Sequence, residues 1–164
     1  MHKILLKIFR TGNLTEPLPV PAPPLEKPCS LARGSLSIRH VDAGSCNACE
    51  LELHALNQSI YSPETLGIRF VASPRHADAL LVTGPVTLAM KEALKATAGA
   101  TPNPRAIIAM GDCAINGGVF RGSYAVAGGV AEVIAVDGQI PGCPPAPGQI
   151  LAFLERLALP EPHP

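Results

Sequence analysis

The sequence predicts an α/β domain built on a doubly wound parallel sheet, preceded by an extended, Pro-rich N-terminal arm. The 164 residues amount to about one domain, and 47% of them are apolar. Short apolar runs alternate with segments of helical composition, which is typical of a parallel sheet covered on both faces. The first part of the chain lacks this alternation, so we expect it to lie outside the domain.

Residues 1–34 form the predicted arm. Its first ten residues, MHKILLKIFR, mix apolar and cationic side chains. Three interpretations stay open for them: a docking segment for a partner protein, a frayed terminus, or a contact with a membrane surface. Residues 17–28 hold six Pro in twelve positions, a density that excludes a helix or a central strand. We expect this stretch to be extended and to cross another surface.

The globular domain is expected to span residues 35–158, with a short tail at 159–164. Its first strand is predicted at 36–42, where apolar and polar residues alternate before a Gly-Ser turn. A helix is expected at 46–61, up to the turn signalled by Ser62 and Pro63.

The rest of the domain continues the alternation. Short apolar runs predict further strands, at 68–72, 79–82, 105–110 and 133–136. Segments rich in helix formers predict two more helices, at 87–98 and 149–157.

Composition excludes several classes of function. Lys plus Arg and Asp plus Glu each total 13, so the formal charge is zero and a nucleic-acid binder is disfavoured. Aromatic residues are only 4% and Trp is absent, which argues against base stacking. We see no signal peptide and no apolar stretch of about 18 residues, so we expect a reducing compartment and no membrane-spanning helix.

Four of the five cysteines follow predicted strands. Cys46 and Cys49 form a Cys-x-x-Cys pair after the first strand, Cys113 follows the fourth strand, and Cys143 follows the fifth. Loops that leave the carboxyl ends of parallel strands converge on one edge of the sheet. We therefore expect the four thiols to meet. Cys29 lies in the arm and is expected to be a free thiol with no ligand role.

Four converging thiols allow several chemistries. A [4Fe–4S] cluster, a zinc ion, a redox pair at Cys46 and Cys49, and unrelated buried thiols all remain open. One Cys-x-x-Cys pair with two single cysteines differs from the two local knuckles usual at structural zinc sites, and this favours the cluster. Gly44, Gly111 and Gly142 would let the backbone approach such a cluster closely.

Four segments carry a resemblance to a known family, VDAGSCNACELEL (41–53), SPRHADALLVTGPVT (73–87), GDCAINGGVF (111–120) and IPGCPPAPGQIL (140–151). They resemble the small-subunit family shared by membrane-bound group 4 [NiFe]-hydrogenases and respiratory complex I, over residues 35–157. The similarity is closest to the hydrogenase-4 and formate hydrogenlyase small subunits. The complex I branch has adjacent cysteines at the first motif, whereas Cys46 and Cys49 have the hydrogenase-like spacing.

The resemblance implies a flavodoxin-like fold and one proximal [4Fe–4S] cluster on Cys46, Cys49, Cys113 and Cys143. The chain would be the electron-transfer subunit of an oxidoreductase complex and would hold no complete active site of its own. Its implied partners are a large subunit with the [NiFe] site, a ferredoxin-like iron–sulfur subunit and membrane subunits. Through them it would be peripheral on the cytoplasmic face of the inner membrane. The alternatives are a complex I-like subunit that passes electrons to quinone and a zinc-stabilised binding module.

Several residues beside the cysteines are singled out. Glu50 and Glu52 follow Cys49, and a solvated helix face is one interpretation of both. Hydrogenase small subunits carry a carboxylate near Glu52, so a proton-relay role is the competing hypothesis for Glu52. Asp112 is expected to cap its loop by accepting backbone N–H bonds. His40 and His54 are expected to be ordinary surface or packing residues.

Two interpretations of the SPRHAD segment compete. In one, it is a turn in which Asp78 pairs with Arg75. In the other, Arg75 or His76 lies just outside the cysteine ligands, donates toward the cluster and raises its potential.

Overall fold

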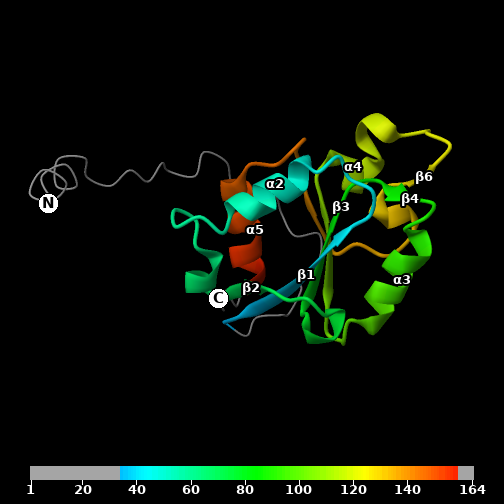
Figure 1. Ribbon diagram of the computed structural model, residues 1–164. Helices are drawn as coiled ribbons and strands as arrows, with labels where there is room; N and C mark the ends of the chain where they lie inside the picture. The colour runs from blue at the N-terminus through cyan, green and yellow to red at the C-terminus, as the bar shows by residue number, and fades with distance from the viewer. Residues whose placement is uncertain (1–33, 159–164) are drawn as a thin grey trace, which may run out of the picture.

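The computed structural model describes residues 34–158, which form a five-stranded sheet between two layers of helices (Figure 1). All neighbouring strands of this sheet are parallel. Their order is β2-β1-β3-β5-β7, so the strands follow the flavodoxin-like order 2-1-3-4-5 when counted along the sheet. This confirms the predicted fold class. The strands are β1 (Leu36–Asp42), β2 (Ile68–Phe70), β3 (Ala79–Thr83), β5 (Ala106–Met110) and β7 (Gly138–Ile140).

Helices cover both faces of the sheet. The helices α2 (Ala48–Ala55) and α5 (Pro147–Ala158) pack on one face, around the buried Phe153. The helices α3 (Lys91–Ala100) and α4 (Asp112–Asn116) pack on the other, around the buried Leu94. Four 3-10 turns complete the described part, η1 (Pro63–Leu66), η2 (Pro74–His76), η3 (Gly118–Phe120) and η4 (Val130–Glu132).

One predicted strand is wrong. The apolar run 133–136 follows η4 and packs against the core on the α3 face, and the last strand is β7 instead. Asp137 fixes where β7 begins, because its N–H donates to the carbonyl of Ile107 at 2.8 Å and its carboxylate accepts the Ile107 N–H at 2.9 Å. The chain therefore enters the sheet only after the most apolar part of the segment.

Other boundaries shift for local reasons. The helix expected at 46–61 is only α2, because Asn47 has a left-handed conformation (φ 72°) and the chain after Ala55 turns through i→i+3 bonds. The helix expected from residue 87 begins at Lys91. The residues before it form the two-residue strand β4 (Val86–Thr87), which pairs antiparallel with β6 (Val126–Gly128). This small second sheet was not predicted.

The predicted arm and tail lie outside the described residues, apart from Gly34 at the arm's end, and so does Cys29. Within residues 34–158, no helix is long and apolar enough to cross a membrane.

Candidate metal centre

Three loops at the carboxyl edge of the sheet carry the four cysteines. Cys46 lies in the loop between β1 and α2, and Cys49 lies in the first turn of α2. Cys113 lies in α4, directly after β5, and Cys143 follows β7. Cys49 and Cys113 are buried, whereas Cys46 and Cys143 are exposed. The centre is thus half enclosed by the fold and half open at its edge.

The four thiols act on one another electrostatically. Burial, together with the charges of Glu50 and the other three cysteines, raises the pKa of Cys49 to about 12. Burial also raises the pKa of Cys113, with contributions from Cys143 and Cys46. Thiolates are the form that binds metal, and four of them in one place repel each other. A positively charged centre between them would remove that penalty.

A turn built on Asp42 shapes the loop that carries Cys46. The Asp42 Oδ1 atom accepts the N–H groups of Gly44 and Ser45, at 2.8 and 2.7 Å. The hydroxyl of Ser45 in turn accepts the N–H of Asn47 at 3.0 Å. Gly44 has φ 127°, and a side chain there would collide with Thr87. These contacts fix the loop that presents Cys46.

The loops after β5 and β7 are bonded to each other. The Gly111 N–H donates to the carbonyl of Ile140, and the Asp112 N–H donates to that of Gly142. The Asp112 carboxylate accepts the Gly142 N–H at 2.9 Å, the loop-capping contact expected for it. Cys113 and Cys143 lie next to these bonds, so the bonds hold the two cysteines in a fixed relation.

Glycines leave space beside the sulfur atoms. Gly111 has φ 87°, and a Cβ atom there would lie 2.7 Å from the Cys49 Sγ atom. A Cβ atom at Gly118 would lie 2.7 Å from the Cys113 Sγ atom. Soft thiolates with close backbone and room beside them are what an iron–sulfur cluster needs. The residues present therefore fit such a cluster. Within residues 34–158, no three His, Cys, Asp or Glu side chains are arranged to hold a single metal ion.

A buried polar network lies directly behind the Cys-x-x-Cys pair. Glu50 is only 8% exposed, so the expectation of a solvated side chain is wrong. Its carboxylate accepts hydrogen bonds from the hydroxyls of Ser45 (2.5 Å) and Thr83. The His40 Nε2 atom lies 3.6 Å from Glu50 Oε1 and 2.9 Å from Thr83 Oγ1. This network joins the first cysteine loop to the end of β3.

Sequence reasoning missed this network because each member looks ordinary alone. Thr83 ends an apolar strand, which was the one available sign of a buried polar contact. His40 is half-buried rather than a simple surface residue, and burial lowers its pKa against the opposing effect of Glu50.

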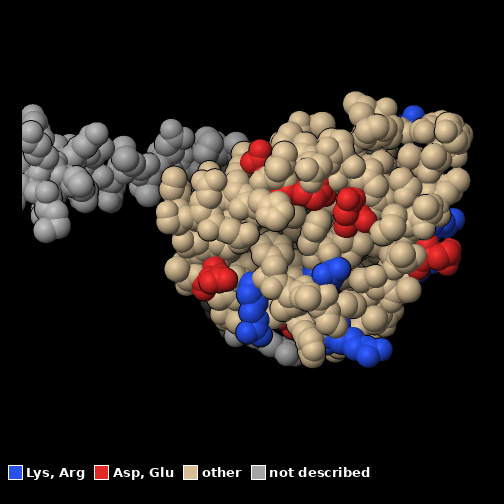
Figure 2. Space-filling view, viewed as in Figure 1, with Lys and Arg blue, Asp and Glu red and all other residues tan. Residues whose placement is uncertain are grey.

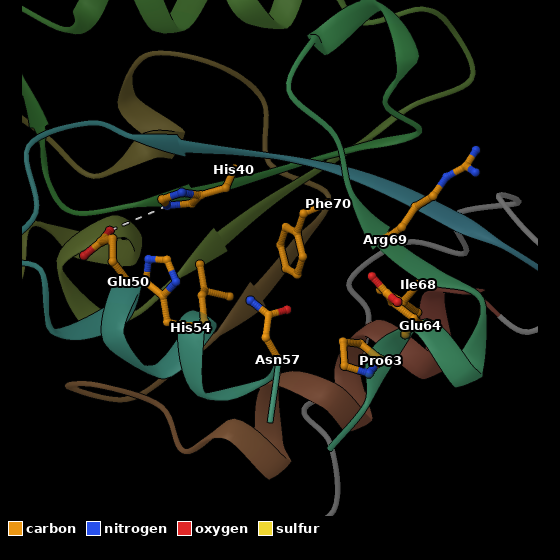
Figure 3. Close-up of a pocket in the computed structure, with 10 residues that line it drawn as sticks. His40, Glu50, His54, Asn57, Pro63, Glu64, Ile68, Arg69 and Phe70 are labelled. Carbon is orange, nitrogen blue, oxygen red and sulfur yellow. Dashed lines mark ion pairs between the residues drawn. The ribbon is translucent and has the colours of Figure 1, made fainter. Parts of the chain in front are cut away.

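A cavity of about 410 Å³ adjoins the network (Figure 3). His40, Glu50 and His54 line one side of it, and Phe70 points into it from the end of β2. Glu52, the expected proton relay, is half-buried on α2 and does not line this cavity. Among the described residues Glu52 makes no hydrogen bond or ion pair, so the buried carboxylate beside the cysteines is Glu50.

The structure separates Arg75 and His76 from the cysteines. They lie in η2, which precedes β3 and therefore sits at the amino edge of the sheet, opposite the cysteine loops. The alternative pairing of Asp78 with Arg75 is also absent from the described residues, because Asp78 accepts the Ser37 N–H instead, at 2.9 Å. Neither interpretation of the SPRHAD segment matches this placement.

Comparison with known proteins places the chain in a family. Residues 46–157 match the family model described as NADH ubiquinone oxidoreductase, 20 Kd subunit. The chain is 43% identical to the probable membrane-bound hydrogenase subunit mbhJ of Pyrococcus furiosus, covering 79% of this chain and 80% of that protein. It is 45% identical to formate hydrogenlyase subunit 7 of Escherichia coli K12, covering 76% of this chain but only 49% of that protein.

Respiratory enzymes supply further relatives. An NADH-quinone oxidoreductase subunit of Geobacter sp. M21 is 40% identical, over 66% of this chain and 64% of that protein. Among solved structures, a chain of the membrane-bound sulfane sulfur reductase, an archaeal respiratory membrane complex, matches with a TM-score of 0.65 and 32% identity, covering 76% of this chain and 68% of that one. These relatives are subunits of oxidoreductase complexes. The chain belongs to the family of the 20 Kd subunit of NADH ubiquinone oxidoreductase, which includes hydrogenase subunits.

Proposed function

We propose that the chain is an electron-transfer subunit that holds one [4Fe–4S] cluster on Cys46, Cys49, Cys113 and Cys143. The observation that carries this proposal is that three separate loops bring the four cysteines to one edge of the sheet, with glycines beside the sulfur atoms of Cys49 and Cys113. The bound cluster would supply one-electron transfer. The residues of this chain would hold it, exclude water from its buried side and set its electrostatic surroundings.

The four cysteines differ in burial, and we infer that the buried and exposed pairs have different roles. Cys49 and Cys113 face the interior, where Gly111 and Gly118 allow close approach. Cys46 and Cys143 are exposed at the rim. Electrons would enter or leave through this rim, because a redox partner can approach it. The exposed apolar side chains of Leu51 (61%) and Val119 (83%) come from elements next to the cysteines, and a partner surface would cover them.

We propose a large subunit with a [NiFe] site as the partner at this rim. The spacing of Cys46 and Cys49 and the two hydrogenase relatives support this choice. A ferredoxin-like iron–sulfur subunit would connect the chain to its electron donor or acceptor. Membrane subunits would hold the complex at the cytoplasmic face of the inner membrane, as the membrane-bound relatives suggest.

A complex I-like role is the second candidate, since the NADH-quinone oxidoreductase relative from Geobacter is 40% identical to this chain. In that case the same cluster would pass electrons to a quinone, and no nickel would be present in the partner.

Anaerobic purification of the chain with its natural partners, followed by metal analysis, tests these proposals. About four iron atoms per chain together with nickel in the large subunit is the expected result. Iron without nickel would retain the cluster and move the function to the quinone-linked alternative. Zinc in place of iron would contradict the electron-transfer proposal and favour a zinc-stabilised binding module.

A further inference from the structure

The chain turns back over Cys113 directly after α4. The N–H of Gly117 donates to the carbonyl of Cys113 at 2.9 Å, and the helix ends there. Gly117 and Gly118 both have positive φ angles, 89° and 50°, which residues with a side chain rarely adopt. A Cβ atom at Gly118 would lie 2.7 Å from the Cys113 Sγ atom and 3.1 Å from its main-chain N and Cα atoms. Two consecutive glycines thus let the main chain pass close beside this cysteine.

The hydrogen bonds of this turn leave one main-chain N–H over. The N–H of Gly118 donates to the side-chain Oδ1 atom of Asn116 at 2.8 Å. Those of Phe120 and Arg121 donate to carbonyls within the turn, at 3.0 and 3.2 Å. Among residues 34–158, no oxygen atom accepts the N–H of Val119. Because main-chain donors seldom stay unpaired in a folded protein, this N–H calls for another acceptor.

The sulfur atom of Cys113 is the acceptor for this N–H. Burial raises the pKa of the Cys113 thiol, and a hydrogen bond from the Val119 main chain opposes that rise. Such a bond favours the negatively charged thiolate over the neutral thiol. The side chain of Val119 is exposed to solvent, so Val119 acts on the cysteine through its main chain.

The Val119 N–H lies where the fold also brings negative charge. The carboxylate of Asp112 directly precedes Cys113, is fixed by its bond to the Gly142 N–H at 2.9 Å, and disfavours a negative charge on the Cys113 sulfur. The N–H of Val119 acts on the same sulfur atom with the opposite sign. The turn after α4 therefore offsets, at one cysteine, part of the effect of its acidic neighbour.

We propose that the turn from Asn116 to Val119 raises the midpoint potential of the cluster by directing the Val119 N–H at the Cys113 sulfur. This inference rests on the proposed function, because it requires a cluster on Cys113. One electron from the redox partner adds negative charge to the cluster and its thiolates, so a donor at a ligating sulfur stabilises the reduced form more than the oxidised form. Asn116 is a positioning residue, since its amide oxygen holds the N–H of Gly118 and thereby the next one.

Removal of this single donor tests the proposal in the anaerobically purified complex. Val119→Pro deletes the N–H at the second residue of η3, a first-turn position that tolerates Pro. Val119→Ala keeps the N–H and is the matched control. We expect reduction of the cluster to become about tenfold less favourable in Val119→Pro, a fall of about 59 mV for a one-electron couple, and to stay at the wild-type value in Val119→Ala. Equal midpoint potentials in all three proteins would overturn the proposal.

Asn116→Ala is the second variant, and it decides the matter if Val119→Pro fails to assemble its cluster. Loss of the amide oxygen leaves the Gly118 N–H without its acceptor and loosens the turn. We expect a smaller fall in midpoint potential, in the same direction. An unchanged potential in Asn116→Ala beside an iron-free Val119→Pro would contradict the proposal.

Pulsed EPR of the reduced complex in D₂O gives a readout that is independent of the potential. The coupling of exchangeable deuterons to the cluster is expected to be weaker in Val119→Pro than in Val119→Ala, because one N–D group at a ligating sulfur is missing. Identical spectra would contradict the hydrogen bond. A wild-type complex without iron would contradict the proposed function itself, whereas full iron content with equal potentials would contradict only the role of this turn.

Discussion

The two edges of the sheet use carboxylates in opposite ways. At the amino edge, Asp78 accepts an N–H from β1 and Asp137 accepts one from β5, so each ties neighbouring strands together. At the carboxyl edge, Asp42 and Asp112 accept N–H groups of the loops that carry cysteines. Hydrogen bonding to carboxylates therefore stabilises the sheet at one end and shapes a site at the other. The same residue type serves packing or chemistry according to the end of the strand where it lies.

Acidic and basic side chains also lie on different parts of the surface. On the face shown in Figure 2, acidic side chains gather along α2 and near the end of β1, while most Lys and Arg side chains lie below them. Glu50 and Asp42 belong to the cysteine edge, and Arg75 and His76 belong to the amino edge. A cluster at the carboxyl edge would have the carboxylates of Glu50 and Asp42 as neighbours, which would lower its potential, and Arg121, whose stem lies beside Gly117 in the loop after Cys113, would act in the opposite direction.

The largest loss of iron is expected from a substitution that fills the space beside the Cys49 sulfur atom. Gly111→Ala places a Cβ atom 2.7 Å from the Cys49 Sγ atom, on a backbone with φ 87° that alanine adopts poorly. We expect this variant to lose most of its iron. Gly99→Ala is the matched control, because Gly99 lies within α3 with nothing near its Cβ position. It should keep its iron and gain about 0.5–1 kcal/mol in stability. Full iron content in Gly111→Ala would show that the glycine is not needed.

The two carboxylates of α2, those of Glu50 and Glu52, are expected to contribute very differently to the free energy of unfolding. Glu50→Ala leaves the hydroxyls of Ser45 and Thr83 without their acceptor, and we expect a loss of about 1–3 kcal/mol in unfolding free energy. Glu52→Ala removes a side chain with no partner in the described residues and should change stability by less than about 0.5 kcal/mol. Denaturant titration of both variants measures the difference. Equal effects would mean that the buried network does not stabilise the cysteine loop.

Acid should weaken the network through His40. Burial lowers the pKa of this imidazole in the folded chain, so the neutral form is favoured there. Below the unfolded value of 6.5 the unfolded chain binds the proton more readily, and stability falls until the pH passes the folded pKa. His40→Gln should lose less stability than the wild type between pH 7 and pH 5, whereas the exposed His54→Gln should match the wild type. Identical profiles for all three proteins would contradict this role of His40.

The smallest effect, on the midpoint potential of the cluster, is expected from substitutions at the amino edge of the sheet. Arg75 and His76 lie one strand length away from the cysteines, so Arg75→Ala and His76→Ala should leave the midpoint potential of the cluster unchanged. Redox titration of the two variants beside the wild type checks this. A clear shift, or a new pH dependence of the potential, would restore the interpretation in which these side chains act on the cluster.

The sequence predicted well what depends on periodicity and poorly what depends on side-chain direction. Alternation of short apolar runs and helices was enough for the sheet, and the position of each Cys after a strand was enough to place the four cysteines at the carboxyl edge. The apolar run 133–136 misled because a half-buried loop that packs against the core can have the same composition as a buried strand. Glu50 was misjudged because its burial depends on hydroxyls from the preceding loop and from the distant Thr83.

The iron content of Cys113→Ser, measured in the anaerobically purified complex beside Cys29→Ser, tests the central claim most directly. Cys113 is buried at the carboxyl edge among the other thiols, whereas Cys29 belongs to the arm. We predict that Cys113→Ser loses its iron–sulfur absorption and most of about four iron atoms, while Cys29→Ser keeps them. If Cys113→Ser retained the full iron content, or if Cys29→Ser lost it, the cluster would not lie where the three loops converge.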